Sequence, residues 1–227
     1  MQFKHLVIGM GQVGRGVSEV LGCPGIDRED PIDQADVIHI CFPYNDEFEK
    51  YVSFYKQATR AEHVVIHSTV PVGTSKKLGA AHSPIRGVHP YLAESIKVFV
   101  KYFGGDGAVI VVKDFEEKGV TCKVLRDSDT CELLKLIDTT TYGLNILIEK
   151  EAARLCKKYD VPLESVYNDS NLTYNKGYND LGMPEFSKYN IKHMDGKIGG
   201  HCIMQNAELL KDTWLTETLI EKNELYG

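Results

Sequence analysis

The sequence predicts an α/β protein, with a parallel sheet over roughly residues 1–125 and an all-α domain built on one long helix over 126–227. Four short apolar runs rich in β-branched residues recur in the first half: "FKHLVIG", "ADVIHICF", "EHVVIHST" and "GAVIVVK". Such runs suit strands buried on both faces of a parallel sheet. Helical or turn-rich segments separate them, and from Asp129 the sequence changes to one long amphipathic stretch.

The first strand leads directly into a glycine turn. "LVIGMGQVGRGVSEVL" has the G-x-G-x-x-G spacing at Gly9, Gly11 and Gly14, and Gln12 and Val13 open the following helix. The first glycine permits a tight turn, the second lets the backbone approach a pyrophosphate, and the third allows close helix packing. The helix N-terminus adds a positive dipole for the phosphates. This context predicts a Rossmann-like domain that binds NAD; the alternative is a glycine-rich turn without a ligand.

The residue that binds the adenosine ribose is expected at the end of the second strand. Asp27 in "GCPGIDRED" lies at about the right distance from the glycine turn. A short connection then leads to "ADVIHICFP", so the usual second helix and third strand are predicted to be trimmed away. Pro43 at the end of that run is a further candidate cofactor contact. Arg28 leaves NADP open, and a solvated loop acid is the other interpretation of Asp27.

The next strand ends in "IHSTVPVGTS", a run of small hydroxyl residues followed by a Pro-Val-Gly turn. Ligands of such sheets bind at the carboxyl ends of the strands, so this segment is expected near the nicotinamide, with Ser68 as a cofactor contact. His67, His82 and His89 could also line the cleft. The sequence provides no partner spacing that would single out one of the three histidines as catalytic.

A long helix is predicted over 129–160, and three threonines before Gly143 leave an interruption near Thr139–Gly143 open. Such a helix cannot bury its apolar surface alone, so we expect it to pack on short following helices and on a second subunit, as a homodimer. The polar, tyrosine-rich segment 166–196 is expected to form loops and short helices that border a site.

Composition excludes several classes of function. A net charge of −6 and a pI near 5.8 disfavour nucleic acid and anionic membranes as partners, which leaves a small-molecule substrate. No segment approaches the roughly 18–20 apolar residues of a membrane span, and a cytoplasmic location is expected. The six cysteines lack the spacing of a zinc site or a disulfide framework, so they are expected to be reduced thiols and no metal site is predicted. Cys41, Cys131 and Cys156 are expected to be small core residues.

Cys202 differs from the other cysteines because glycines precede it in "GKIGGHCIMQNAELL". It could be a packed turn thiol, a metal ligand or a nucleophile. His201 is expected to make local hydrogen bonds, and together with His193 it forms no recognisable metal set.

Three motifs in order, "STVPVGT", "ELLKL" and "GGHCI", resemble the nucleotide-sugar 6-dehydrogenases, which act on UDP-glucose, UDP-N-acetylmannosamine or GDP-mannose. The resemblance covers nearly the whole chain and implies a sugar-nucleotide substrate. It implies that Cys202 attacks an aldehyde made by a first hydride transfer, that a second transfer gives a thioester, and that water releases a carboxylate. It further implies that Lys135 stabilises oxyanions, that Glu94 in "HPYLAES" acts through water, and that Thr69 helps to hold that water.

The chain departs from the family pattern at two positions. Thr139 stands where the family has asparagine, and Asn206 stands where it has aspartate. Both positions polarise the reacting hydroxyl or its water in the family, so the proton transfers of the reaction are expected to differ here.

The sequence also ends 25 residues after Cys202, so a short form without the C-terminal UDP-binding domain is expected, with a smaller or differently held substrate or a changed reaction. Two alternatives stay open. The first is a β-hydroxyacid-type dehydrogenase, which shares the long helix and its lysine but needs no cysteine. The second is a dinucleotide-binding module without catalysis.

Overall fold

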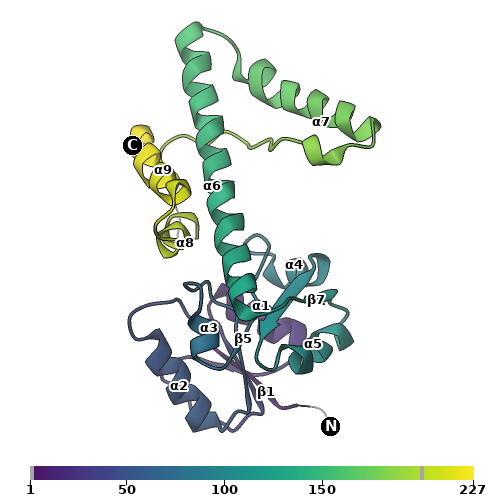
Figure 1. The fold of residues 1–227 in the computed structure, drawn as a ribbon, viewed down its shortest axis with the longest axis vertical. Coiled ribbons are helices and arrows are strands. Elements are labelled where there is room, and N and C mark those ends of the chain that lie inside the picture. The colour runs from purple at the N-terminus through teal and green to yellow at the C-terminus, as the bar shows by residue number, and fades with distance from the viewer. Residues whose placement is uncertain (1–2, 200–201) are drawn as a thin grey trace. The chain divides into compact units, whose positions relative to one another are not determined.

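The computed structural model describes residues 3–199 and 202–227. The chain divides into two compact units, Met1–Lys135 and Leu136–Gly227. A sheet with helices on both faces forms the first unit, and the described part of the second unit consists of helices and loops (Figure 1). The predicted fold class, a Rossmann-like sheet followed by helices built on one long helix, is confirmed.

The first unit contains a seven-stranded sheet in the order β2-β1-β3-β4-β5-β6-β7. Every neighbouring pair is parallel except β5 and β6. The strand order reverses between β1 and β3, and ligands of such sheets bind at the carboxyl ends of the strands on either side of that reversal. The strands are β1 His5–Ile8, β2 Gly25–Ile26, β3 Val37–Ile40, β4 His63–Ile66, β5 Ala81–His82, β6 Lys101–Gly105 and β7 Cys122–Val124.

The two faces of the sheet carry separate hydrophobic cores because successive side chains of a strand point to opposite faces. Val7 packs in a core with α1 (Gln12–Leu21), α4 (Leu92–Val98) and α5 (Ala108–Glu117). Its neighbours Leu6 and Ile8 pack in the other core, with α2 (Phe48–Thr59). Figure 1 shows α2 and α5 on opposite sides of the strands. β2 is an edge strand, and the predicted trimming after it is therefore confirmed.

The prediction of a strand at "GAVIVVK" is wrong, because this segment opens α5. The buried residues are Ala108, Val111, Val112 and Phe115, which is helical spacing, whereas Val109 and Ile110 are exposed. The apolar residues on the exposed face hid this period and made the segment look like a strand buried on both faces. The sheet is instead completed by the short strands β5, β6 and β7, which the sequence patterns did not indicate.

The second unit is built on the C-terminal part of α6 (Ser128–Tyr159), which runs without a break through Thr139–Gly143. A Cβ atom at Gly143 would lie 2.7 Å from the Ile203 side chain, so this glycine allows close packing and does not end the helix. The interruption left open by the sequence is therefore absent. The core of the unit is formed by Leu147, Ile198, Ala207 and Leu219.

Short helices follow α6, as predicted. They are a π-helix Glu164–Asp169, α7 (Ser170–Asp180), a 3-10 turn Pro184–Phe186, α8 (Ile203–Leu209), α9 (Trp214–Asn223) and a 3-10 turn Glu224–Tyr226. The tyrosine-rich segment is thus largely helical. Across residues 3–199 and 202–227, no helix combines the length and the apolar composition that crossing a membrane requires.

Candidate functional site

The glycine turn between β1 and α1 is closed on one side and open on the other. A Cβ atom at Gly14 would lie 1.9 Å from the Gly9 carbonyl oxygen, and one at Gly9 would lie 2.9 Å from the Phe42 nitrogen. At Gly11, which caps α1, a Cβ atom would meet nothing within 4 Å. Gln12 is exposed, and Val13 packs against the core. The backbone at the start of α1 therefore leaves room on the Gly11 side, which the close approach of a pyrophosphate would need.

Two alanine substitutions separate the packing role of this turn from a binding role. We expect Gly14→Ala to destabilise the fold by about 1–3 kcal/mol, because its methyl group collides with backbone. Gly11→Ala should leave the free energy of unfolding within about 0.5 kcal/mol of wild type, yet weaken dinucleotide binding. Urea unfolding and fluorescence titration with NADH measure the two effects. Tight NADH binding by Gly11→Ala would contradict the assignment of this turn as the pyrophosphate site.

Asp27 lies directly after β2 and is tied to the glycine turn. Its Oδ1 accepts a hydrogen bond from the Met10 N–H at 2.8 Å. The neighbouring Arg28 donates to the Tyr51 hydroxyl at 2.8 Å and stacks on the Tyr51 ring. These side chains border a cavity of about 200 Å³ at the ends of β1, β2 and β3. It is lined by Ile8, Gly9, Asp27, Arg28, Phe42, Pro43, Asn45, Tyr51 and Tyr55.

The residues of this cavity fit the adenosine half of a dinucleotide. Aromatic and aliphatic side chains provide apolar walls, and one carboxylate lies at the end of the second strand. That is the chemistry with which this class of sheet holds an adenine and its ribose.

Ser68 and Thr69 follow β4. The Ser68 Oγ donates to the Phe42 carbonyl oxygen at 2.6 Å, which ties the carboxyl ends of β3 and β4 together. Ser68 is buried and Thr69 is half-buried. The structure thus gathers Gly9, Asp27, Pro43, Ser68 and Thr69 at one edge of the sheet, as the positions of the strands predicted.

Glu94 lies elsewhere in the first unit, exposed on α4. It lines a cavity of about 380 Å³ together with Gln12 and Arg15 of α1 and with Pro90. Lys135 is half-buried on α6 and ends the first unit.

Thr139, Cys202 and Asn206 belong to the second unit. Thr139 is buried on α6, one helical turn after Lys135. Cys202 is exposed at the start of α8, and its carbonyl oxygen accepts a hydrogen bond from the Asn206 N–H at 3.2 Å. Gly200 and His201 lie outside the described residues. The local hydrogen bonds expected for His201 therefore stay a prediction. By contrast Cys41, Cys131 and Cys156 are buried, as predicted, and burial raises the pKa of Cys131 to about 12.

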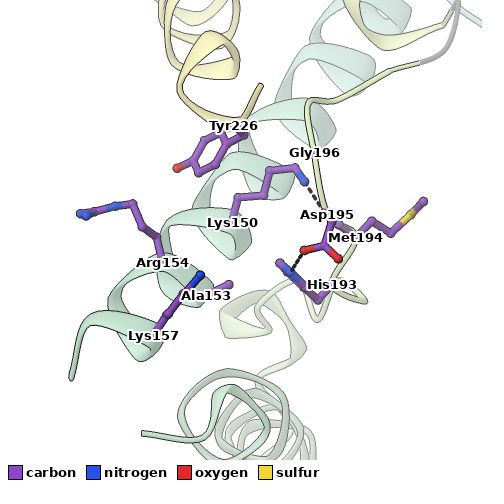
Figure 2. A pocket seen from close by; sticks show the side chains of 9 residues that line it. All are labelled: Lys150, Ala153, Arg154, Lys157, His193, Met194, Asp195, Gly196 and Tyr226. Carbon is purple, nitrogen blue, oxygen red and sulfur yellow. Dashed lines mark hydrogen bonds and ion pairs between the residues drawn. The ribbon is translucent and has the colours of Figure 1, made fainter. Parts of the chain in front are cut away.

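A cavity of about 200 Å³ in the second unit lies beside the chain segment that leads to Cys202 (Figure 2). Lys150, Arg154 and Lys157 of α6 line it. Lys150 donates to the Met194 carbonyl oxygen, and His193 contacts the buried Glu149 carboxylate at 2.8 Å. These contacts fasten the segment to α6. Arg154 pairs with Glu151, so the charge of that guanidinium is already compensated.

Two of the three histidines that could have lined the cleft lie in the core of the first unit. His67 belongs to a row of hydrogen-bonded rings, with His39 Nδ1 at 3.0 Å from His67 Nε2 and His5 Nδ1 at 2.9 Å from His39 Nε2. The Ser83 carbonyl oxygen accepts from His67 Nδ1 at 2.7 Å. Because a carbonyl only accepts, His67 donates through Nδ1 and accepts through Nε2, and His39 does the same. This pattern assigns neutral tautomers to His39 and His67. His5 Nε2 faces the Asp114 carboxylate at 3.4 Å.

Burial sets the protonation of this core row. Loss of hydration lowers the pKa of His39 and His67 well below the usual value and lowers that of His82 to about 3. The same cause lowers the pKa of the Lys101 ammonium to about 7, where its Nζ lies 3.3 Å from the Ser83 oxygen. His89 is exposed. His67, directly after β4, and His82, on β5, therefore do not line the cleft, because both side chains are buried in the core.

Sequence reasoning missed Glu132, a buried carboxylate that binds the loop after Thr69. The only signal was its place as the first residue of the "ELLKL" motif. Within residues 3–199 and 202–227, no group of three or more His, Cys, Asp or Glu side chains could hold a metal ion.

Comparison with known proteins relates the chain to sugar-nucleotide enzymes. No family model matches it. It is 22% identical over 191 residues to a UDP-N-acetyl-D-mannosamine dehydrogenase of Methanococcus maripaludis, covering 79% of this chain but 40% of the relative. The chain thus spans less than half the length of that relative.

Solved structures share the fold. A UDP-D-ManNAc dehydrogenase of Pyrococcus horikoshii superimposes with a TM-score of 0.72 at 17% identity, over 97% of this chain and 68% of that one. A 3-hydroxyisobutyrate dehydrogenase of Mycobacterium tuberculosis superimposes with a TM-score of 0.69 at 11% identity, over 100% of this chain and 94% of that one. The chain is thus similar in sequence to UDP-N-acetyl-D-mannosamine dehydrogenases and shares its fold with these dehydrogenase structures.

Proposed function

We propose that the chain is an NAD-dependent oxidoreductase that oxidises the primary alcohol of a sugar nucleotide to a carboxylate, with Cys202 as the covalent nucleophile. One observation carries the covalent step. Of the six cysteines, all within the described residues, Cys202 is the exposed one, and it lies in the "GGHCI" motif. A reacting thiol must be reachable by substrate, which the buried cysteines are not.

The proposed roles follow the chemistry of each side chain. Bound NAD would accept one hydride from the alcohol and a second from the adduct on the enzyme. The Cys202 thiolate would add to the aldehyde carbon, and the Lys135 ammonium would stabilise the oxyanion that forms. Glu94 and Thr69 would direct water onto the thioester, which releases the carboxylate and restores the thiol.

Thr139 and Asn206 would assist the reacting hydroxyl and its water. Both side chains are neutral where the resemblance implies an amide and a carboxylate, respectively. Neither replacement can take up a proton at neutral pH as a carboxylate would, so Asn206 would serve by hydrogen bonding alone. We therefore propose that a neutral Lys135 amine takes up the alcohol proton in the first hydride transfer. The ammonium formed in that step would then stabilise the oxyanion that arises when Cys202 adds to the aldehyde.

NAD is proposed over NADP because of Asp27. One of its carboxylate oxygens is bound by the Met10 N–H, and the other has no hydrogen-bond partner among the described residues. A free carboxylate oxygen accepts from a ribose hydroxyl and repels a 2′-phosphate. Arg28 is engaged with Tyr51, which supports the same preference.

The stoichiometry of cofactor reduction tests the proposal. With UDP-N-acetyl-D-mannosamine or UDP-glucose, we expect two NADH for each substrate consumed, because an alcohol loses two hydrides on its way to a carboxylate. NADH absorbance and chromatography of the sugar nucleotide measure the ratio, with NADP as the comparison cofactor. Tight NADH binding without turnover of any sugar nucleotide or hydroxyacid would instead support the non-catalytic module.

A β-hydroxyacid-type dehydrogenase is the second candidate. The observation in its favour is the likeness in fold to the 3-hydroxyisobutyrate dehydrogenase, because this chain covers 94% of that protein. In this candidate Lys135 would serve a single hydride transfer and Cys202 would have no chemical role. The same assay with 3-hydroxy acids would then yield one NADH for each substrate.

A homodimer is proposed from the exposed apolar side chains of α6. Ile148 is 60% exposed and Tyr159 is 66% exposed, with Leu155 between them at helical spacing on the same face. A second copy would cover this face, since large exposed apolar patches are uncommon on monomers. Sedimentation equilibrium distinguishes a dimer from a monomer directly.

A further inference from the structure

Glu132 is a buried carboxylate with both oxygens engaged by one loop. The residue is 1% exposed. Its Oε2 accepts a hydrogen bond from the Gly73 N–H at 2.6 Å, and its Oε1 accepts one from the Ser75 N–H at 2.8 Å. α6 provides Glu132, whereas Gly73 ends the loop after β4 and Ser75 lies at the start of the helix that follows it. The carboxylate therefore joins segments that are distant in the sequence.

The loop that Glu132 holds is the one that begins with Thr69. The residue before it, Ser68, donates a hydrogen bond to the Phe42 carbonyl oxygen and thereby holds the start of the loop. Its far part turns at Gly73, whose φ of +94° favours glycine, just before α3 (Thr74–Lys77). The Thr74 N–H donates to the Pro71 carbonyl oxygen at 3.2 Å, and the Ser75 N–H donates to Glu132. Without the carboxylate, the far part would lose two of its anchoring bonds.

Lys135 follows Glu132 by three residues on α6, so less than one helical turn separates the anchor from the lysine. A shift of α6 along the loop would move the Lys135 amine relative to Thr69. We propose that Glu132 is a positioning residue, whose carboxylate sets the register between the loop that carries Thr69 and the turn of α6 that carries Lys135. This inference rests on the proposed function for the roles of Thr69 and Lys135.

The geometry calls for a carboxylate at this position. Two N–H groups face the side chain, so both of its terminal atoms must accept. A glutamine would turn its NH₂ group toward one of these donors, and an aspartate is one methylene too short to reach both. His82 Nδ1 lies 4.0 Å from Glu132 Oε1. Burial keeps that imidazole neutral, so it cannot replace the two amides as a counter-charge.

Glu132→Gln and Glu132→Asp in the full chain test the inference, with Val112→Ala as the matched control. Val112 is a core residue of α5, and its truncation lowers stability without touching the loop. We expect Glu132→Gln to lower kcat by about 10²-fold, because a misplacement of about 1 Å has effects of that size, while KM for NAD stays near wild type. Glu132→Asp should recover part of the loss, and Val112→Ala should leave kcat unchanged.

Hydrogen exchange gives a readout that does not depend on turnover. In Glu132→Gln, the Gly73 and Ser75 amides should exchange at least tenfold faster than in wild type, and in Val112→Ala they should change no more than the rest of the sheet. Unchanged protection of these two amides in Glu132→Gln would overturn the inference, as would a wild-type kcat in that variant. If the wild-type chain oxidises no substrate, the proposed function fails, and the exchange result alone decides whether Glu132 holds the loop.

Discussion

Cys202→Ser should reduce formation of the carboxylate product by at least about 10³-fold, because removal of a covalent nucleophile has effects of that order or larger. A serine hydroxyl is a far weaker nucleophile than a thiolate. The first hydride transfer needs no thiol, so the variant should still reduce NAD, up to the aldehyde stage. Rapid-quench chromatography of the sugar nucleotide, alongside NADH absorbance, separates the two stages.

Cys122→Ser is the matched control for this variant. Cys122 is a half-buried free thiol on β7 and is not one of the proposed site residues. It should retain the wild-type ratio of two NADH for each substrate. Unchanged turnover of Cys202→Ser on the true substrate would eliminate the covalent mechanism and favour the hydroxyacid-type reaction.

Lys101→Met should stabilise the protein at pH 7, by roughly 1–3 kcal/mol. Lys101 is 4% exposed and lies between the Phe103 and Phe115 rings, where an ammonium is poorly solvated. The Ser83 oxygen that it contacts also accepts from His67, so removal of the amine leaves no buried acceptor unpaired. Methionine fills a similar volume without a charge.

The pH dependence follows from the same burial. Folding lowers the pKa of Lys101 from 10.5 to about 7, so between these values the unfolded chain binds more protons than the folded one. The free energy of unfolding therefore rises with pH across that window, by up to about 1.4 kcal/mol per pH unit. His39, His67 and His82 also have lowered pKa values in the folded protein. The free energy of unfolding therefore falls as pH falls below about 6.5, because these imidazoles take up protons in the unfolded chain first.

Urea unfolding from pH 4 to pH 10 measures both windows. Lys101→Met should flatten the slope above pH 7. It should also make the loss of stability in acid shallower, because the Lys101 charge is one of the causes that lower the pKa of His39, His67 and His82 in the folded protein. Lys118→Met on the surface serves as the control for the loss of a charge. An unchanged slope above pH 7 in Lys101→Met would show that the Lys101 amine is charged in the folded protein.

Local patterns predicted much of the fold. The runs around β1, β3 and β4, the glycine turn and the long helix were all identified correctly, because each is set by residues close in sequence. The segment at α5 was not, since Val109 and Ile110 are apolar on its exposed face and conceal the helical period. The strands β5 and β7 have two and three residues, too few to show any period, and β6 has the sequence KYFGG, which lacks a run of β-branched residues.

Within the candidate site, the sequence identified the residues with recognisable spacing, from Gly9 to Gly14 and around Cys202. These motifs predicted a dinucleotide cofactor and a thiol nucleophile. Only the tertiary structure decided that Glu132 anchors the loop at Gly73 and Ser75, 59 and 57 residues away in the chain. Only the tertiary structure likewise placed His39 and His67 in a hydrogen-bonded row in which both imidazoles are neutral. A buried polar group must find its partner wherever the fold brings one, and the sequence carries no periodicity for partners that distant.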